Sequence, residues 1–207
     1  AGVIDVALGA SHSCARLYSG QVQCWGNGAD GRLGYGDTVT RGNAPGNLAN
    51  SGGAVDFATP SIAVAVACGG AHTCVNLASG DVKCWGDNSR GQLGIGSTVA
   101  VGGSATPASS SIVAFAGGRA VRALALGTQH SCVVFALGGF QCWGNGDGGA
   151  LGTSSQNNVG NSGPVSSGSL PPLLTDGVVY PSASATPAIT PSPTEGFVPS
   201  ASLQPQA

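Results

Sequence analysis

The sequence predicts an all-β protein built from three copies of one unit and followed by an extended tail. Residues 6–36, 66–96 and 124–152 align with one another directly, and self-similarity at a near-constant period is the signature of repeat architectures. Within each copy, short apolar runs flank a Gly-containing turn, which is the pattern of a β-hairpin. No segment shows a clear helical period.

The composition excludes several functional classes. Only 8% of the residues are charged, and seven cations with a net charge of −2 cannot neutralise many phosphates, so we expect no nucleic-acid partner. No apolar run approaches the roughly 18 residues of a transmembrane helix, so we expect no membrane span. Nucleophile–base pairs, phosphate-binding loops and paired carboxylates are missing as sequence motifs. We therefore expect no enzyme, no catalytic residue, no cofactor and no metal.

The second copy displays the elements of the unit in order. Residues 63–68 form a run of Val and Ala closed by Gly69-Gly70, and they predict a strand. Residues 72–77 and 82–85 predict a hairpin around Ser79-Gly80, where glycine supplies the positive φ of a tight reversal. The Gly-rich residues 86–96 predict a return loop whose large apolar residue Leu93 should point inward.

Three short motifs in this copy point to a known family. Residues 69–73 (GGAHT), 80–86 (GDVKCWG) and 91–96 (GQLGIG) resemble the repeat of the regulator of chromosome condensation family. The resemblance extends over roughly residues 1–165 in three copies. It implies four-stranded blades of a β-propeller, but it does not determine function, because one fold hosts many functions.

The chain departs from this family in the number and length of its repeats. Propellers close with about four to eight blades, whereas here three repeats occupy about residues 1–57, 58–115 and 116–165. We expect a partial propeller, either an open arc or one completed by another subunit. The loops at residues 38–53 and 98–110 are extended, residues 166–180 could supply closing strands, and residues 181–207 form the tail.

Six cysteines share one spacing of ten residues: Cys14/Cys24, Cys74/Cys84 and Cys132/Cys142. In a hairpin centred on residue 19 the first pair lies directly opposite, with Cβ atoms within about 5.5 Å, close to what a disulfide requires. We predict three disulfides within hairpins and hence an oxidising, extracellular setting. Free thiols and zinc are the alternatives, although the short spacing of zinc knuckles is absent. This setting argues against nucleotide exchange on a small GTPase.

Other recurring residues have a structural interpretation beside a functional one. We expect the histidines to hold strand starts by ring hydrogen bonds rather than to form a ring of metal ligands, and the tryptophans to pack between blades rather than to stack on sugars. We expect the aspartates after each tryptophan to form turns rather than bind calcium. These residues are His12, His72, His130, Trp25, Trp85, Trp143, Asp30, Asp87 and Asp147. Cys68 should fill a core position, or else form an intermolecular disulfide.

The tail changes the character of the chain. Residues 181–207 are rich in Pro, Ser and Thr, with Glu195 as their only charge, which favours polyproline II. This composition is typical of O-glycosylated stalks, or of a flexible linker. The candidate glycosylation residues are Pro187, Thr190, Pro191, Ser192, Pro193, Thr194, Pro199 and Ser200, and the candidate assembly residues are Val178, Val179, Tyr180, Phe197 and Val198.

An open arc leaves its two end faces uncovered. Missing blades in a longer chain, closure of two arcs into a six-bladed ring, or head-to-tail stacking would each cover them, and heterologous contacts that do not close make filaments. We expect an extracellular structural protein whose partner is itself, assembling through blade edges and the tail into a fibril or surface matrix. The alternative is a secreted protein- or carbohydrate-binding module, inhibitor-like or lectin-like, that uses the two long loops.

Overall fold

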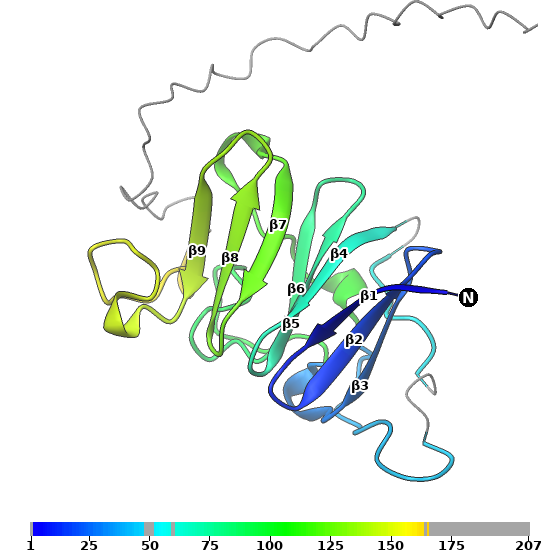
Figure 1. Ribbon diagram of the computed structural model, residues 1–207. Coiled ribbons are helices and arrows are strands. Elements are labelled where there is room, and N and C mark those ends of the chain that lie inside the picture. The colour runs from blue at the N-terminus through cyan, green and yellow to red at the C-terminus, as the bar shows by residue number, and fades with distance from the viewer. Residues whose placement is uncertain (1, 48–51, 59–60, 164, 166–207) are drawn as a thin grey trace, which may run out of the picture.

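The computed structural model describes residues 2–47, 52–58, 61–163 and 165, and it is organised as three antiparallel sheets. In each sheet the strands follow chain order. The first sheet holds β1 (Val3–Leu8), β2 (His12–Leu17) and β3 (Val22–Gly26); the second holds β4 (Ala63–Cys68), β5 (His72–Leu77) and β6 (Val82–Gly86); the third holds β7 (Val121–Leu126), β8 (His130–Phe135) and β9 (Phe140–Gly144). Figure 1 shows the second sheet between the other two.

The loops carry only short helical turns in the described part of the chain, where no α-helix occurs. These 3₁₀ turns are η1 (Ala29–Gly31), η2 (Pro107–Ser109), η3 (Ala116–Gly118) and η4 (Asp147–Gly149). The fold is therefore all-β, as predicted, and its three sheets do not close on themselves.

The hairpin registers repeat from sheet to sheet. Cys14 lies opposite Cys24, Cys74 opposite Cys84, and Cys132 opposite Cys142. The first strand of each sheet also has one irregularity at the same place, between Val3/Asp5, Ala63/Ala65 and Val121/Ala123. Equivalent sequence positions therefore occupy equivalent places, and the three sheets can be compared residue by residue.

Over the residues that the structure describes, each sheet has three strands where the family resemblance implies four. The segments that lead from one blade to the next, at residues 54–57 and 112–115, meet the sheet edge through a backbone bond, from the N–H of Val55 to the carbonyl of Val22 and from the N–H of Val113 to the carbonyl of Val82. Two residues further on, Phe57 packs on Trp85 with ring centroids 5.5 Å apart, and Phe115 packs on Trp143 at 5.8 Å. These segments leave the sheet edge because they carry an aromatic ring to the next blade, so the ladder does not continue.

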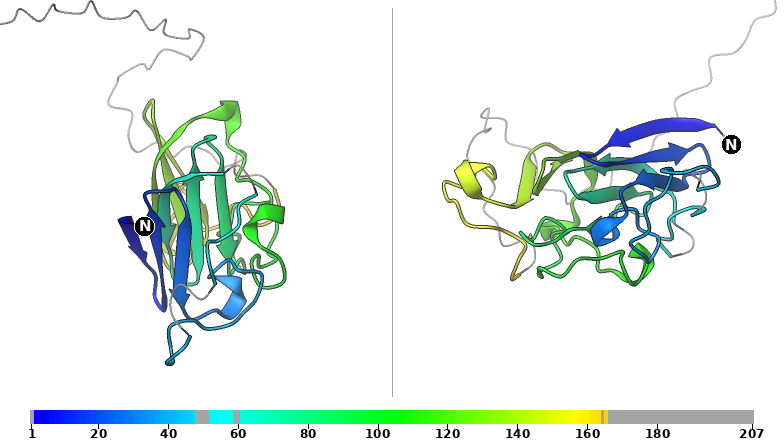
Figure 2. Two further views of the ribbon diagram at one scale, coloured as in Figure 1. Left: turned by 90° about the vertical axis from the view of Figure 1, so that its right-hand side faces the viewer. Right: turned by 90° about the horizontal axis from the view of Figure 1, so that it is seen from below.

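The sheets are arranged as blades around a shared inner side. The ends of the first strands meet at an open hollow lined by Leu8, Cys68 and Leu126. In the right-hand view of Figure 2, β1 lies on one side of the row, and the loops carrying η1 and η2 lie on the opposite side. The strands that would line the propeller axis therefore sit inward and the long loops outward.

The core is divided between the two junctions of neighbouring blades. One cluster joins the Cys14–Cys24 disulfide of the first blade to Ala63, Val66 and Cys68 of the second. The other joins the second blade to Val121 and Phe135 of the third. The inward leucine predicted from each return loop is buried: Leu33, Leu93 and Leu151 are 0%, 0% and 1% exposed.

Candidate functional site

The first junction between blades is held by a chain of four polar groups. His12 Nε2 lies 2.8 Å from the Thr73 hydroxyl of the next blade, and this hydroxyl donates to the carbonyl of Arg32 at 3.0 Å. The Trp85 indole N–H donates to the same carbonyl at 3.0 Å. Because the Thr73 hydroxyl donates its proton to the Arg32 carbonyl, it accepts a hydrogen bond from the His12 ring. The proton of the neutral ring is therefore on Nε2.

The second junction repeats this arrangement. His72 Nε2 lies 2.8 Å from the Ser131 hydroxyl, while Ser131 Oγ and Trp143 Nε1 both donate to the carbonyl of Gln92 at 2.9 Å. The sequence-based interpretation placed the histidine bond at a strand start. The structure places it across two blades, so each histidine specifies how one blade sits on the next.

Burial makes these two histidines neutral. The pKa of His12 is lowered to about 4, by burial first and by the nearby Arg32 second. The pKa of His72 is also lowered to about 4, again chiefly by burial. The junctions are therefore built around uncharged imidazoles, and they should lose stability at acid pH, where the histidines of the unfolded chain bind protons.

The first blade has a face with no neighbour in the described part of the chain, which we call the leading face. It contains Val3, Val6 and Leu8, which are 52%, 51% and 73% exposed, together with half-buried Ser13 and Trp25. The corresponding residues of the second blade, 60 positions later, are Ala63, Val66, Cys68, Thr73 and Trp85, all at most 9% exposed. The leading face is thus an exposed apolar surface, whereas the equivalent face of the second blade is buried against the first blade.

The third blade has the opposite face open, which we call the trailing face. It contains half-buried His130 and Cys132 with exposed Val134, Gly149 and Ala150. At the first junction the equivalent positions are His12, Cys14, Arg16, Gly31 and Arg32, and four of these five residues are buried. A Cβ placed on Gly31 would meet the backbone of Gly103 at 2.1 Å, whereas one on Gly149 would meet nothing within 4 Å.

The structure forms the three disulfides at the predicted pairs, with Cα–Cα distances of 4.0, 4.1 and 4.1 Å. Among the described residues Cys68 is the free cysteine, and it is buried. The tail residues proposed for glycosylation and assembly, from Val178 to Ser200, lie outside the described residues, as do the closing strands expected at 166–180.

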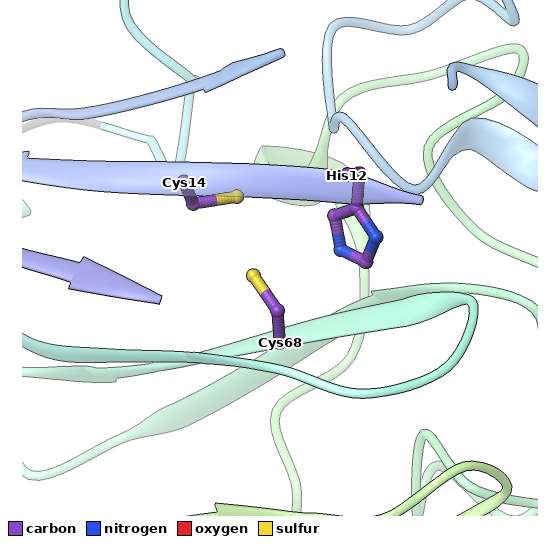
Figure 3. A group of neighbouring side chains, drawn as sticks. All are labelled: His12, Cys14 and Cys68. Carbon is purple, nitrogen blue, oxygen red and sulfur yellow. The ribbon is translucent and has the colours of Figure 1, made fainter. Parts of the chain in front are cut away.

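Cys68 belongs to a cluster that sequence reasoning did not identify. Its Sγ, the Cys14 Sγ and a ring nitrogen of His12 lie within 4.8 Å of one another, and Figure 3 shows the Cys68 side chain on β4 pointing toward the other two on β2. The Cys14 sulfur is engaged in a disulfide, so it is not a thiolate ligand. Burial raises the pKa of the Cys68 thiol to about 12. This trio is therefore core packing rather than a metal site.

One of the long loops is ordered by its own charged side chains. The guanidinium of Arg41 binds both carboxylate oxygens of Asp37, at 2.9 and 2.8 Å, and it lies 4.2 Å from the centre of the Tyr35 ring. On the other long loop, the carbonyls of Pro107, Ala108 and Ser110 accept from the Lys83 amine of β6. Side chains therefore hold the backbone at residues 37–41 and at residues 107–110.

Two family profiles match the chain, and both describe the regulator of chromosome condensation (RCC1) repeat. One matches residues 3–32 and 63–92, and the other residues 19–75 and 79–134. The chain belongs to the RCC1 repeat family. The resemblance identified from residues 69–73, 80–86 and 91–96 is confirmed.

Curated relatives include the ultraviolet-B receptor UVR8 of Arabidopsis thaliana, 36% identical over 72% of this chain and 31% of that protein. The probable E3 ubiquitin-protein ligase HERC6 of Homo sapiens is 31% identical over 86% of this chain and 16% of that protein. The chain spans less than a third of either relative, and the matches cover the repeat part.

Solved structures show the same fold. Human WBSCR16 superposes with a TM-score of 0.57 at 25% identity, covering 76% of this chain and 38% of that one. Yeast RCC1 (Prp20), solved bound to Kap60, gives 0.53 at 22% identity, covering 70% of this chain and 30% of that one. The three blades thus superpose on part of each of these two larger chains.

Two observations bear on the cellular setting. The three disulfides indicate an oxidising environment. Over the residues that the structure describes, no helix has the length and apolar character needed to cross a membrane.

Proposed function

We propose that this protein is an extracellular structural building block, and that copies of it assemble head to tail through their blade edges into a fibril or surface matrix. The observation that carries the proposal is the pair of open faces on an otherwise rigid arc. The leading face exposes Val3, Val6 and Leu8 together. Contiguous exposed apolar residues of this kind mark interaction surfaces.

Rigidity and low charge support the same proposal. A disulfide joins the second and third strands of every blade, which helps each blade keep its shape without a neighbour. With only 8% charged residues, little repulsion opposes close packing of copies. No residue is assigned a chemical step under this proposal. Two features of the tail remain predictions: its part in the assembly and its O-glycosylation, for which the candidate residues run from Pro187 to Ser200.

The test is the oligomeric state of the native, unreduced chain, measured by light scattering and negative-stain electron microscopy on one sample. We expect long filaments that lengthen with concentration. A chain that stays monomeric at high concentration would overturn the proposal, and a discrete particle of two chains would replace the fibril by a closed ring.

A second candidate, a secreted binding module, is favoured by contacts within the described parts of the two long loops. The ion pair of Arg41 with Asp37 and the bond from Lys83 to the Pro107 carbonyl hold these parts in place, and yeast RCC1 was solved bound to another protein. Replacing residues 43–47 by a short Gly-Ser linker should then abolish binding of a ligand while leaving assembly intact. The structural proposal expects no such ligand.

A further inference from the structure

The two open faces carry opposite halves of the junction that the chain already builds twice. At each internal junction one blade supplies a histidine and a loop carbonyl, and the next supplies a hydroxyl and an indole N–H. The trailing face retains the first half, in His130 and the Ala150 carbonyl. The leading face retains the second half, in Ser13 and Trp25. Each face therefore offers the hydrogen-bonding groups that the other lacks.

The apolar parts of the two faces are complementary in the same way. Inside the chain, the Cys14–Cys24 disulfide packs in one cluster with Ala63, Val66 and Cys68 of the next blade. The trailing face presents the equivalent disulfide, Cys132–Cys142. The leading face presents Val3, Val6 and Leu8, which are equivalent to Ala63, Val66 and Cys68, the residues that pack on the Cys14–Cys24 disulfide. The larger side chains at two of these positions increase the apolar area available.

Space for the contact is also present at the loop of the trailing face. Gly31 and Gly91 lie so close to the next blade that an added Cβ would meet its backbone at 2.1 and 2.6 Å, at Gly103 and Asn161. Gly149 holds the equivalent position with the same positive φ, +75°, and an added Cβ there would meet nothing within 4 Å. The loop is shaped for a neighbouring blade that this part of the chain does not contain.

We propose that the trailing face of one copy binds the leading face of a second copy as a third junction of the same kind. In it, His130 pairs with the partner's Ser13, and the Ala150 carbonyl accepts from the partner's Ser13 and the partner's Trp25. The contact is heterologous, since it joins two different faces. It deepens the proposed function, on which it rests for the assumption that copies of this chain meet.

The first test blocks each face separately with the same substitution. Val6→Glu places a carboxylate on the leading face, and Val134→Glu places one on the trailing face. The residue equivalent to Val134 in the middle blade is Asn76, which donates to the carbonyl of Val121 across the second junction. Val6 and Val134 are 51% and 40% exposed, so both variants should fold. Val64→Glu, at 45% exposure on the middle blade, is the matched control.

We expect each blocked variant to be monomeric by sedimentation velocity, with its self-association weakened about a hundredfold or more because a carboxylate is buried without a partner. An equimolar mixture of the two should form a species of two chains and nothing larger, because one intact face of each kind remains. This dimer also shows that both variants are folded. Val64→Glu should assemble like the wild-type chain.

The second test reads the contact through fluorescence. Trp85 and Trp143 are 0% exposed, whereas Trp25 is half-buried, so assembly should shift the emission of Trp25 to shorter wavelength. The shift should be absent in Trp25→Phe and in Val134→Glu. Trp25→Phe should also weaken association about tenfold, because it keeps a ring but removes the N–H that reaches Ala150.

The outcomes separate this inference from the proposed function. Filaments that persist unchanged in Val6→Glu and Val134→Glu would overturn the inference and leave the structural role standing on another surface. A discrete two-chain particle that both substitutions disrupt would uphold the inference and overturn the fibril. Self-association of Val134→Glu alone would show leading faces binding each other and would overturn the inference. A wild-type chain that is monomeric at high concentration would overturn both.

Discussion

The middle blade and the two outer blades are built from one sequence motif but lie in different surroundings. Every residue of β5 and β6 is buried, whereas β2 and β8 alternate between buried and partly exposed residues. The tryptophans make the difference plain: Trp85 is 0% exposed, while Trp25, in the same motif, is half-buried. The comparison teaches that the motif specifies a blade, and that neighbouring blades decide which of its residues become core.

The largest effect should come from removing the indole at an internal junction. Trp85→Ala should lower the free energy of unfolding by about 3–5 kcal/mol, since it leaves a cavity and removes one of the two donors to the Arg32 carbonyl. Trp25→Ala, measured where the chain is monomeric, should cost about 1–2 kcal/mol. Urea denaturation followed by circular dichroism compares the two, and equal losses would break the distinction between middle and outer blades.

Glycines of the return loops give a comparison at constant backbone geometry. Gly91→Ala should lower the free energy of unfolding by about 2–5 kcal/mol, because the alanine is strained at a positive φ and its Cβ clashes with Asn161. Gly149→Ala should cost only the backbone part, about 1–2 kcal/mol. Thermal unfolding of both variants measures the difference in destabilisation, which is the contribution of the steric clash with the next blade.

Acid should weaken the internal junctions. The pKa of His12 and that of His72 are each lowered to about 4 by burial, below the value of about 6.5 in an unfolded chain. The unfolded state therefore binds more protons between these values, so the stability is present in full above pH 6.5 and is lost as pH falls toward 4.

Between pH 7 and pH 5 the loss should be about 2 kcal/mol per histidine, because each lowered pKa unit is worth about 1.4 kcal/mol. Urea titrations at the two pH values should show this loss in the wild-type chain. The double variant His12→Gln/His72→Gln should show a flatter dependence on pH. A slope as steep as that of the wild-type chain would mean that other groups control acid stability.

The smallest effects concern the residue that ends the first strand of each blade. Cys68→Ala at the first junction should cost about 1 kcal/mol, since its side chain is 9% exposed. Leu8→Ala at the equivalent position should change the monomer by no more than about 0.5 kcal/mol, because Leu8 is 73% exposed. Alkylation gives an independent check, since the Cys68 thiol should react with iodoacetamide only after denaturation.

Local features of the chain were predictable because they depend on neighbours in sequence. The hairpins follow from Gly-centred turns between apolar runs, and the spacing of ten residues places Cys14 opposite Cys24 in register. The inward leucines follow from being large apolar residues at one repeated position of a Gly-rich loop. The open faces followed from counting three repeats, and assembly through blade edges was expected, but the residues that form the faces were not identified. The assembly residues named from the sequence were Val178, Val179, Tyr180, Phe197 and Val198 of the tail, which lie outside the described residues.

The missed features all depend on contacts between blades. In the first two blades the described linkers add no fourth strand, because Phe57 and Phe115 leave the sheet edge to reach the next tryptophan. The histidine bonds span blades because the hydroxyls of Thr73 and Ser131 are turned toward the preceding blade, which no local pattern encodes. The approach of Cys68 to His12 and Cys14 has the same origin, since β4 packs on β2 across a junction.

The sequence by itself determined the blade: its strands, its turns, its disulfide register and its family, because these arise from residues close along the chain and repeat three times. Only the tertiary structure decided which copies of the motif are buried, which tryptophan and which histidine lack a neighbour, and where an apolar surface remains. Burial depends on what packs against a residue, and identical motifs receive different neighbours according to their place in the row.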